Sequence, residues 1–251
     1  MQFMYKYFVK ILNLSFYRIK NILTILRDRA LPENRFLEKD YRSPFKMYER
    51  EQLEKGYNHF KKYFKYSVFL DTLTIRRYSI QRAKENDPNQ ECYYLEFGVW
   101  RGHTINYLSE YVNKIYGFDS FEGLKEDWIG MHDKPKGTFN LNKKLPKLNS
   151  NVIPVVGWIQ DTLQPFIEKE NPKINFIHID VDTYETTKYI LENLKPYLVK
   201  KSIILFDELY NIPGWDVGEY KALTEVFGEN EFKFIAFSKH GRQAAIEVTP
   251  N

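Results

Sequence analysis

From residue 92 onward, the chain alternates short apolar runs with longer amphipathic stretches, and this pattern constrains the fold more than any other feature. Such alternation is typical of parallel strands that are joined by crossover helices. The last two runs have no long helix between them, so they predict a terminal hairpin. The predicted strands are residues 92–97, 114–118, 152–156, 174–179, 202–206, 232–237 and 244–248. We therefore predict an α/β fold with a mostly parallel seven-stranded sheet and helices on both faces.

A sheet of this kind needs a large apolar core, and 43% of the 251 residues are hydrophobic. This composition excludes fibrous and disordered classes. The sequence Asp-Pro-Asn at residues 87–89 interrupts the helical pattern just before the first strand of the core. We place a boundary there, between an N-terminal helical extension at residues 1–88 and a core domain at residues 89–251. Cys92 is the only cysteine, which excludes an internal disulfide framework and agrees with a cytoplasmic protein.

The first 30 residues carry six basic side chains and one acidic side chain, and apolar residues recur at helical spacing over residues 1–27. This pattern predicts an amphipathic helix. Charged residues interrupt it too often for a membrane span, and no small-residue cleavage site follows it. We expect the helix to pack on its own domain or on a second copy in a homo-oligomer. The alternative is a peripheral contact of residues 1–28 with an anionic membrane surface, at the inner face of the membrane.

Lysines alternate with aromatic residues at 61–66, and single-stranded nucleic acids can bind such a pattern through stacking and phosphate contacts. A half-buried helix with a solvated face produces the same pattern more often. The net charge of the whole chain is only +4, and the basic excess lies in the first 30 residues. We therefore expect no nucleic-acid partner, and we predict a further helix at residues 68–84.

The first strand of the core ends in a loop that contains two glycines. Gly98 and Gly102 lie four residues apart, which lets the backbone turn tightly and approach a ligand, and Thr104 can help to open the next helix. Glu96 suits a ligand with an ammonium group better than a pyrophosphate. Asp119 ends the second strand about 20 residues later, where an acid can accept hydrogen bonds from ribose hydroxyls. Their joint spacing favours a ligand site over ordinary strand-end caps.

Five segments of the core together resemble class I S-adenosylmethionine-dependent methyltransferases. They are LEFGVWRG at 95–102, YGFDSFEGL at 116–124, DTL at 161–163, HIDVDTY at 178–184 and FDE at 206–208. The nearest resemblance is to the macrocin O-methyltransferase family, whose characterised members methylate sugar hydroxyls with a magnesium ion. The resemblance covers roughly residues 90–230 and implies a Rossmann-like fold.

The resemblance implies roles for individual positions. Glu96 and Gly98 would line the methionine moiety of S-adenosylmethionine, Asp119 would hold the ribose, and Asp182 would face the amino-acid end. The other predicted cofactor residues are Gly102 and Thr104 in the glycine loop and Ser120, Phe121, Gly157, Trp158 and Asp161 around the adenine. Asp182 also fits a helix capping box with Glu185, and both roles are compatible.

Asp180, Asp207 and Glu208 match the metal positions of the family, although relatives commonly carry aspartate or asparagine at the position of Glu208. If the strands that precede these acids pair, they lie about 4.8 Å apart, so three carboxylates can converge on one ion. All-oxygen ligands favour Mg²⁺ or Ca²⁺ over zinc. We predict Mg²⁺, and solvated carboxylates without a metal are the alternative.

Methyl transfer to an aliphatic hydroxyl requires a base that accepts its proton or a cation that lowers its pKa. Asp180 would contribute through the metal ion. His103 lies near the cofactor loop and His132 lies in the insertion after the second strand, so either could act as the base. His178 lies inside a predicted strand, where a satisfied buried imidazole is the more frequent case.

The long connection at residues 122–150 is predicted to cover an acceptor, and Trp215 either stacks on that acceptor or packs in the core. The leading hypothesis is an O-methyltransferase that is assisted by Mg²⁺ and acts on a sugar or glycoconjugate hydroxyl. Three alternatives stay open: a catechol-like phenolic acceptor, methylation of nucleic acid, and a non-catalytic scaffold with the cofactor fold. The near-neutral core and the absence of an Asn-Pro-Pro-Tyr-type motif disfavour nucleic acid.

Overall fold

The computed structural model describes residues 43–130 and 134–249. Residues 51–251 form one compact unit, and the described part of the preceding unit consists of Ser43 and the beginning of helix α3 (Pro44–Phe64). The amphipathic helix predicted at residues 1–27 and the candidate base His132 lie outside the described residues. Within the described ranges, no helix is both long and apolar enough to cross a membrane.

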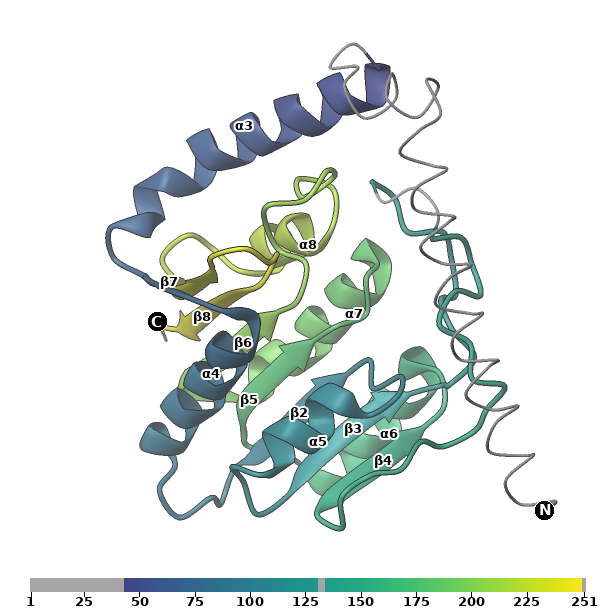
Figure 1. Cartoon of the computed structure of the whole chain (residues 1–251). Helices are drawn as coiled ribbons and strands as arrows, with labels where there is room; N and C mark the ends of the chain where they lie inside the picture. The colour runs from purple at the N-terminus through teal and green to yellow at the C-terminus, as the bar shows by residue number, and fades with distance from the viewer. Residues whose placement is uncertain (1–42, 131–133, 250–251) are drawn as a thin grey trace, which may run out of the picture. The chain divides into compact units, whose positions relative to one another are not determined.

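An eight-stranded sheet with the order β1-β7-β8-β6-β5-β2-β3-β4 runs through the unit 51–251 (Figure 1). Neighbouring strands are parallel except at β8, which is antiparallel to β6 and β7. The strands are β1 (Val68–Leu70), β2 (Tyr93–Phe97), β3 (Ile115–Asp119), β4 (Val152–Val156), β5 (Ile174–Ile179), β6 (Leu198–Phe206), β7 (Phe232–Ser238) and β8 (Ala244–Val248). The further helices are α4 (Thr72–Asn86), α5 (His103–Ser109), α6 (Ile159–Glu170), α7 (Tyr184–Leu194), the 3-10 turn η1 (Lys195–Tyr197) and α8 (Glu219–Val226). The predicted mostly parallel α/β fold is confirmed, including its terminal hairpin.

Strand β1 is the eighth strand, and the sequence analysis missed it by placing residues 68–84 in one helix. Val68 pairs with Ala236 of β7, and α4 begins only at Thr72. Ile75 and Ile80 of α4 are fully buried among core residues of the sheet. The structure therefore differs from the predicted division after residue 88, because residues 51–88 belong to the same compact unit as the core.

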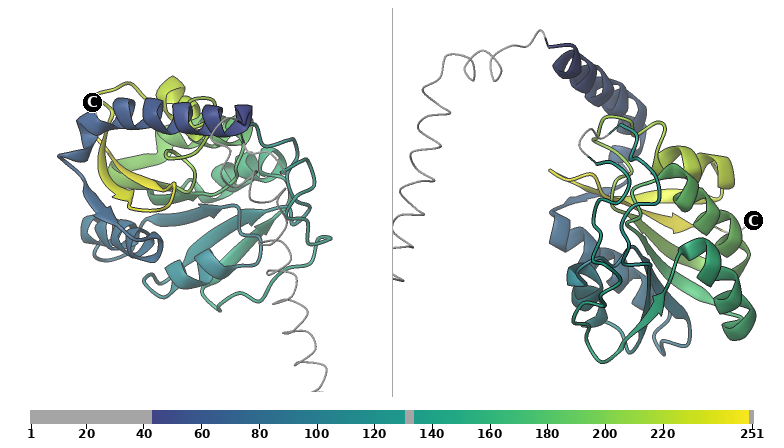
Figure 2. Two further views of the ribbon diagram at one scale, coloured as in Figure 1. Left: turned by 45° about the horizontal axis from the view of Figure 1, so that its top comes forward. Right: turned by 90° about the vertical axis from the view of Figure 1, so that its right-hand side faces the viewer.

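Helices cover both faces of the sheet, and alternate strand residues enter two separate cores. Helices α4 and α5 lie on one face, and α6, α7 and α8 lie on the other (Figures 1 and 2). In β2, Tyr94 belongs to the core under α4 and α5, whereas Leu95 and Phe97 belong to the core under α6 and α7. Because both sets of side chains are buried, such strands read as continuous apolar runs rather than as alternating ones.

The second half of α3 packs beside β7. Phe60 is fully buried and makes edge-to-face contacts with Phe234 and Phe237. Trp215 is only 4% exposed, and its Nε1 donates to the carbonyl of Gln52 at 3.3 Å. The expectation that Trp215 stacks on an acceptor is therefore wrong, and its alternative role in core packing is confirmed.

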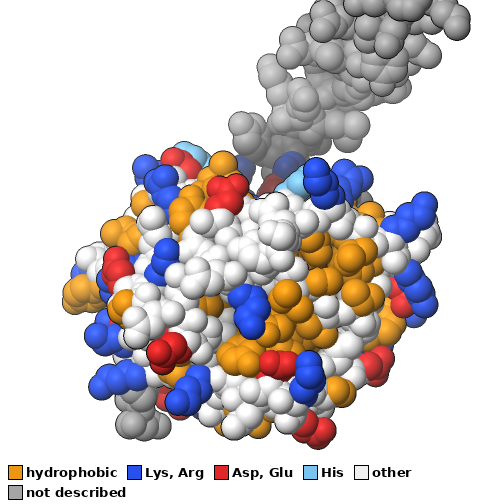
Figure 3. Space-filling view, turned by 90° about the horizontal axis from the view of Figure 1, so that it is seen from below, with side chains coloured by type: hydrophobic (Ala, Val, Ile, Leu, Met, Phe, Trp, Pro, Cys, Tyr) orange, Lys and Arg blue, Asp and Glu red, His pale blue; other side chains and the backbone are white. Residues whose placement is uncertain are grey.

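The surface drawn in Figure 3 mixes charges of both signs. Lysine and arginine side chains are interspersed there with aspartate and glutamate around apolar side chains. A continuous basic patch is the usual footprint of a nucleic-acid-binding face. The described residues of this face do not form such a patch.

Candidate active site

The sheet forms a cavity where its strand order reverses. From β2 the chain adds β3 and β4 on one side, and it later adds β5 and β6 on the other side. In parallel sheets this arrangement leaves a crevice outside the carboxyl ends of the central strands. A cavity of about 390 Å³ opens at this edge. It is lined by residues that follow β2, β3, β5 and β6, by the long connection after β3, and by Arg76 of α4.

Gly98 lies where β2 and β5 meet at this edge. Its φ is +86°, and a Cβ at this position would lie 1.8 Å from the carbonyl oxygen of Asp180. The Gly98 amide donates to the Phe118 carbonyl at 2.9 Å, and the Asp180 amide donates to the Phe97 carbonyl at 2.9 Å. Only glycine allows this close approach without strain. The loop backbone therefore forms an open cradle for a ligand.

Asp119 holds the loop that follows Gly98. Its Oδ2 accepts hydrogen bonds from the amides of Val99 at 2.8 Å and Trp100 at 2.7 Å, and its Oδ1 accepts from the amide of Phe121 at 2.6 Å. Asp119 also lines the cavity. A carboxylate oxygen can accept two hydrogen bonds, so Oδ1 can accept one more from a ribose hydroxyl. One side chain thus orders the loop and presents an acceptor to the cavity.

Apolar and aromatic side chains line the end of the cavity near β3 and β4. Trp158 precedes the first residue of α6, and it lines this end together with Ser120, Phe118 and Ile159. The ammonium group of Lys125 lies 5.5 Å from the centroid of the Trp158 ring. A flat, mostly apolar slot with a few polar groups fits a nucleobase such as adenine.

Three carboxylates gather at the ends of β5 and β6. Ligand oxygens of Asp180, Asp182 and Glu208 lie within 4.8 Å of one another. Burial, followed by the charge of nearby Asp207, raises the pKa of Asp180 and of Glu208 well above the usual range, and it raises the pKa of Asp182 to about 7. Among the described residues, Glu208 Oε2 is buried and has no hydrogen-bond partner. An all-oxygen cluster of this kind fits a hard divalent cation, which would remove the mutual repulsion.

Asp207 belongs to a second group of charges. Its Oδ1 accepts from Arg76 at 2.9 Å and from Gln243 at 2.8 Å, and it faces His178 Nε2 at 3.4 Å. On the other side of the imidazole ring, His178 Nδ1 lies 3.2 Å from Glu96 Oε2. Arg76, Asp207, His178 and Glu96 therefore form a buried chain of ionisable groups.

Burial works against the charged forms of these groups. At Asp207 and His178 the partners outweigh it, whereas at Glu96 burial prevails and raises the pKa of the carboxyl. The close contact with His178 and the positive charges of His178 and Arg76 lower the pKa of Asp207. The close contacts with Asp207 and Glu96 raise the pKa of His178 to about 10 despite its complete burial. Asp207 is thus an ion-pair partner. The predicted ligands Asp180, Asp207 and Glu208 do not form one group, because Asp180 lies with His178 and Asp207 in one cluster and with Asp182 and Glu208 in another.

Asp182 does not act as the helix cap that its sequence context also allowed. The N-cap of α7 is Thr183, whose hydroxyl donates to the hydroxyl of Thr186 at 3.0 Å. Asp182 itself has φ of +65° and is 9% exposed at the cavity. The capping alternative is therefore wrong, and the side chain stays available to the acidic cluster.

The structure divides the predicted site residues into two sets. Those that line the cavity are Gly98, His103, Thr104, Asp119, Ser120, Trp158, Asp180, Asp182 and Glu208. Those outside the lining are Glu96, Gly102, Phe121, Gly157, Asp161 and Asp207. Glu96 does not reach the cavity because its side chain is fully buried beside His178. Phe121 is a core residue with 2% exposure, and Asp161 is exposed in the first turn of α6.

The long connection after β3 lines the cavity, as its length predicts, through Gly123, Leu124, Lys125, Trp128 and Phe139. Sequence reasoning missed Arg76, which enters from α4 outside every motif. It also missed Glu219, a buried acid that accepts from the Glu208 amide at 2.9 Å. Neither residue carries a local sequence signal, because each reaches the site from a helix whose position depends on packing.

Residues 95–209, which include the glycine loop and the acidic strand ends, match the family model described as a methyltransferase domain. Residues 95–209 are therefore similar to methyltransferase domains. The description of the family model names no subfamily, so the narrower resemblance to macrocin O-methyltransferases stays a prediction.

The methyltransferase domain shares its fold with solved methyltransferases. One is the crystal structure of CalS11, a calicheamicin methyltransferase, with 21% sequence identity and a TM-score of 0.58. The alignment covers 86% of this chain and 93% of the CalS11 chain. An apo structure of CalS11, described as a TDP-rhamnose 3′-O-methyltransferase, is 20% identical and covers 82% and 95%, with a TM-score of 0.51. The O-methyltransferase NovP is 18% identical and covers 71% and 79%, with a TM-score of 0.50. No curated protein matches the sequence.

Proposed function

We propose that this domain transfers the methyl group of S-adenosylmethionine to a hydroxyl of a sugar or glycoconjugate, with a divalent cation held by Asp180, Asp182 and Glu208. The observation that carries the proposal is the buried, unpartnered Oε2 of Glu208 within a cluster of acids that lines the same cavity as Gly98 and Asp119. The sugar acceptor is supported by the fold shared with CalS11, a TDP-rhamnose 3′-O-methyltransferase.

In this reaction the bond between the methyl carbon and the sulfonium breaks as a bond to the hydroxyl oxygen forms, and the hydroxyl releases its proton. The products are S-adenosylhomocysteine and a methyl ether. A bound Mg²⁺ or Ca²⁺ would lower the pKa of a coordinated hydroxyl. The chain supplies the positioning, since the acidic cluster and Gly98 adjoin at the ends of β5 and β2.

Two residues of the chain support these roles. Glu219 is buried at the start of α8, and its carboxylate accepts a hydrogen bond from the Glu208 amide at 2.9 Å. This bond orients Glu208, which carries the unpartnered oxygen. His103 is exposed and lines the cavity, so it can accept the proton that the hydroxyl releases.

The test is a methylation assay with the full chain, S-adenosylmethionine and three acceptors: TDP-rhamnose, a methyl glycoside and a catechol. Mass spectrometry of the products identifies the methylated acceptor. We expect a methylated sugar, loss of turnover in a chelator, and recovery when Mg²⁺ is restored. Glu168→Gln, which alters an exposed acid of α6, serves as the matched control and should behave like the wild type.

Different failures contradict different parts of the proposal. Methylation of the catechol alone would move the acceptor to the phenolic class. Full turnover in the chelator would reject the cation. A chain that binds no S-adenosylmethionine in calorimetry would favour the scaffold alternative.

A further inference from the structure

Arg76 is a charged residue of the cavity that no sequence motif explains. Its side chain is 15% exposed and lines the cavity together with Gly98, Thr104 and Asp180. One terminal nitrogen donates to Asp207 Oδ1 at 2.9 Å. The Nε–H is buried and has no hydrogen-bond partner within residues 43–130 and 134–249. The pairing with Asp207 therefore leaves part of the donor capacity of this guanidinium unused.

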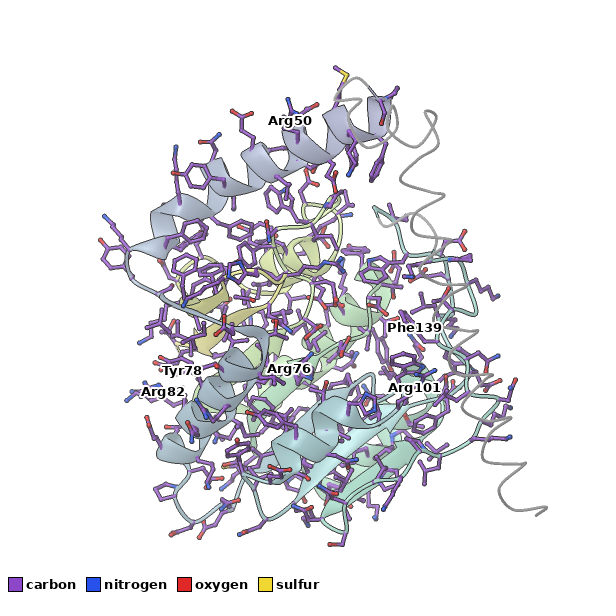
Figure 4. All side chains as sticks on the ribbon, viewed as in Figure 1. Arg50, Arg76, Tyr78, Arg82, Arg101 and Phe139 are labelled. Carbon is purple, nitrogen blue, oxygen red and sulfur yellow. The ribbon has the colours of Figure 1, made fainter. Side chains whose placement is uncertain are left out.

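The other lysine and arginine side chains among the described residues of the cavity wall lie elsewhere. The Arg101 guanidinium lies 4.5 Å from the Trp100 ring centroid, and Trp100 in turn contacts Phe139 at 5.3 Å between centroids. Lys125 lies over Trp158, at the end near β4. Figure 4 shows Arg101 and Phe139 beside each other, with Arg76 apart from them on α4. Among the lysine and arginine residues described in the cavity wall, Arg76 is thus the one that adjoins the ends of β5 and β6.

The methyl donor must lie along this cavity in one direction. Its adenine fits the slot around Trp158, and its ribose hydroxyls meet Asp119. The methionine moiety then extends toward Gly98 and Asp180. That moiety ends in an ammonium group and a carboxylate. Of these two groups, the carboxylate needs a cation as its partner.

We propose that Arg76 is a positioning residue that binds the carboxylate of the methionine moiety of the donor. This inference rests on the donor site argued above and adds a residue from outside the matched domain. A guanidinium presents a planar set of N–H donors that match a carboxylate in geometry and charge.

Helix α4 holds Arg76 firmly enough for this task. Ile75 and Ser79 on either side of it are fully buried, and the Ser79 hydroxyl donates to the Ile75 carbonyl at 2.8 Å. Tyr107 of α5 donates to the Leu73 carbonyl at 3.3 Å, which joins the first turn of α4 to the helix that follows the glycine loop. Binding therefore needs little reordering of the backbone around Arg76.

The experiment compares two ligands that differ only in the carboxylate: S-adenosylmethionine and decarboxylated S-adenosylmethionine. Calorimetry with the full chain, without acceptor, measures both affinities. We expect the wild type to prefer S-adenosylmethionine by about tenfold or more, as for a charge-assisted hydrogen bond, and we expect Arg76→Gln to abolish this preference. Arg77→Gln is the matched control, because it removes the same charge from an exposed neighbour on α4 that does not line the cavity.

A second variant protects the test against misfolding. Arg76→Gln leaves Asp207 buried without its cation, whereas Arg76→Gln/Asp207→Asn removes both charges of the pair. We expect the double variant to lose the carboxylate preference as well, and Asp207→Asn alone to keep it. Equal weakening of both ligands, or a preference that survives in the double variant, would overturn the inference. A wild type that binds neither ligand would instead contradict the donor site itself.

Discussion

The two ends of the cavity differ in how completely the chain satisfies its own polar groups. At the β3 end, Asp119 accepts three backbone hydrogen bonds and holds the glycine loop in place. At the β5 and β6 end, Glu208 Oε2 and Glu219 Oε1 are buried without partners among the described residues. Unpartnered buried oxygens are rare because each costs about 1–3 kcal/mol or more. The donor end is thus complete within the chain, and the proposed cation would complete the acidic end.

The two ends therefore differ in the kind of interaction that binds a ligand. The donor end uses hydrogen bonds and close backbone approach, which depend weakly on salt or added ions. The acidic end consists of ionisable carboxyl groups, so its properties should depend on pH and, with the proposed cation, on divalent ions. Changes to one end should therefore leave the other nearly intact, and four predictions test this separation.

The largest effect is expected at Glu208. Glu208→Gln keeps the size of the side chain but removes the charge that a cation needs, so we expect kcat/KM to fall by about a hundredfold to a thousandfold. Affinity for S-adenosylmethionine, measured by calorimetry, should change by less than about twofold. A large loss of donor affinity would show that the two ends are not separate.

The second prediction concerns the ion. Adding Mg²⁺ to metal-free protein should raise its thermal stability, by about 2.7 kcal/mol when the ion is at a hundred times its Kd. Differential scanning calorimetry measures the shift, with added NaCl at equal ionic strength as the control. The shift should vanish in Glu208→Gln and persist in Asp119→Asn. An equal shift in both variants would place the ion elsewhere.

The third prediction tests the donor end. Asp119→Ala removes the acceptor of three amide hydrogen bonds and of the ribose, so donor affinity should fall by about tenfold or more. Asp119→Asn keeps one acceptor oxygen and should lie in between. The Mg²⁺ response should stay in both. Unchanged donor affinity in Asp119→Ala would remove Asp119 from the site.

The smallest effect concerns Asp182, whose folded-state pKa is about 7 because of its burial. An unfolded aspartate has a pKa of about 3.9, so the folded state keeps a proton that the unfolded chain loses between these values. Stability from this group therefore decreases as pH rises from about 4 to about 7, and it stays low above that. We expect Asp182→Asn to stabilise metal-free protein by about 1 kcal/mol at pH 8, less as the pH falls toward 4.

Urea unfolding at several pH values measures this difference. Asparagine tolerates the φ of +65° at this position, so the substitution adds little strain. A variant that is less stable than the wild type at pH 8 would show that Asp182 is paired in a way the acidic cluster does not explain.

Local sequence determines most of the fold and much of the donor end. The parallel strands appear as continuous apolar runs because both of their faces are buried, and the ligand residues follow those runs directly. Gly98 and Asp119 could therefore be assigned from their positions after the first two core strands. Strand β1 escaped detection because its three residues merge with the pattern of α4, and their strand conformation depends on pairing with β7.

The acidic end shows what only the tertiary structure decides. The sequence places Asp180, Asp182, Asp207 and Glu208 near strand ends, but it does not say which carboxylates face one another. Asp207 pairs with Arg76, a residue 131 positions away, and also lies near Asp180, whereas Asp182 lies with Asp180 and Glu208. The orientation of a side chain at a strand end depends on the helix packed beside it. Such contacts between distant elements leave no periodic signal in the sequence, so they emerge only when the chain has folded.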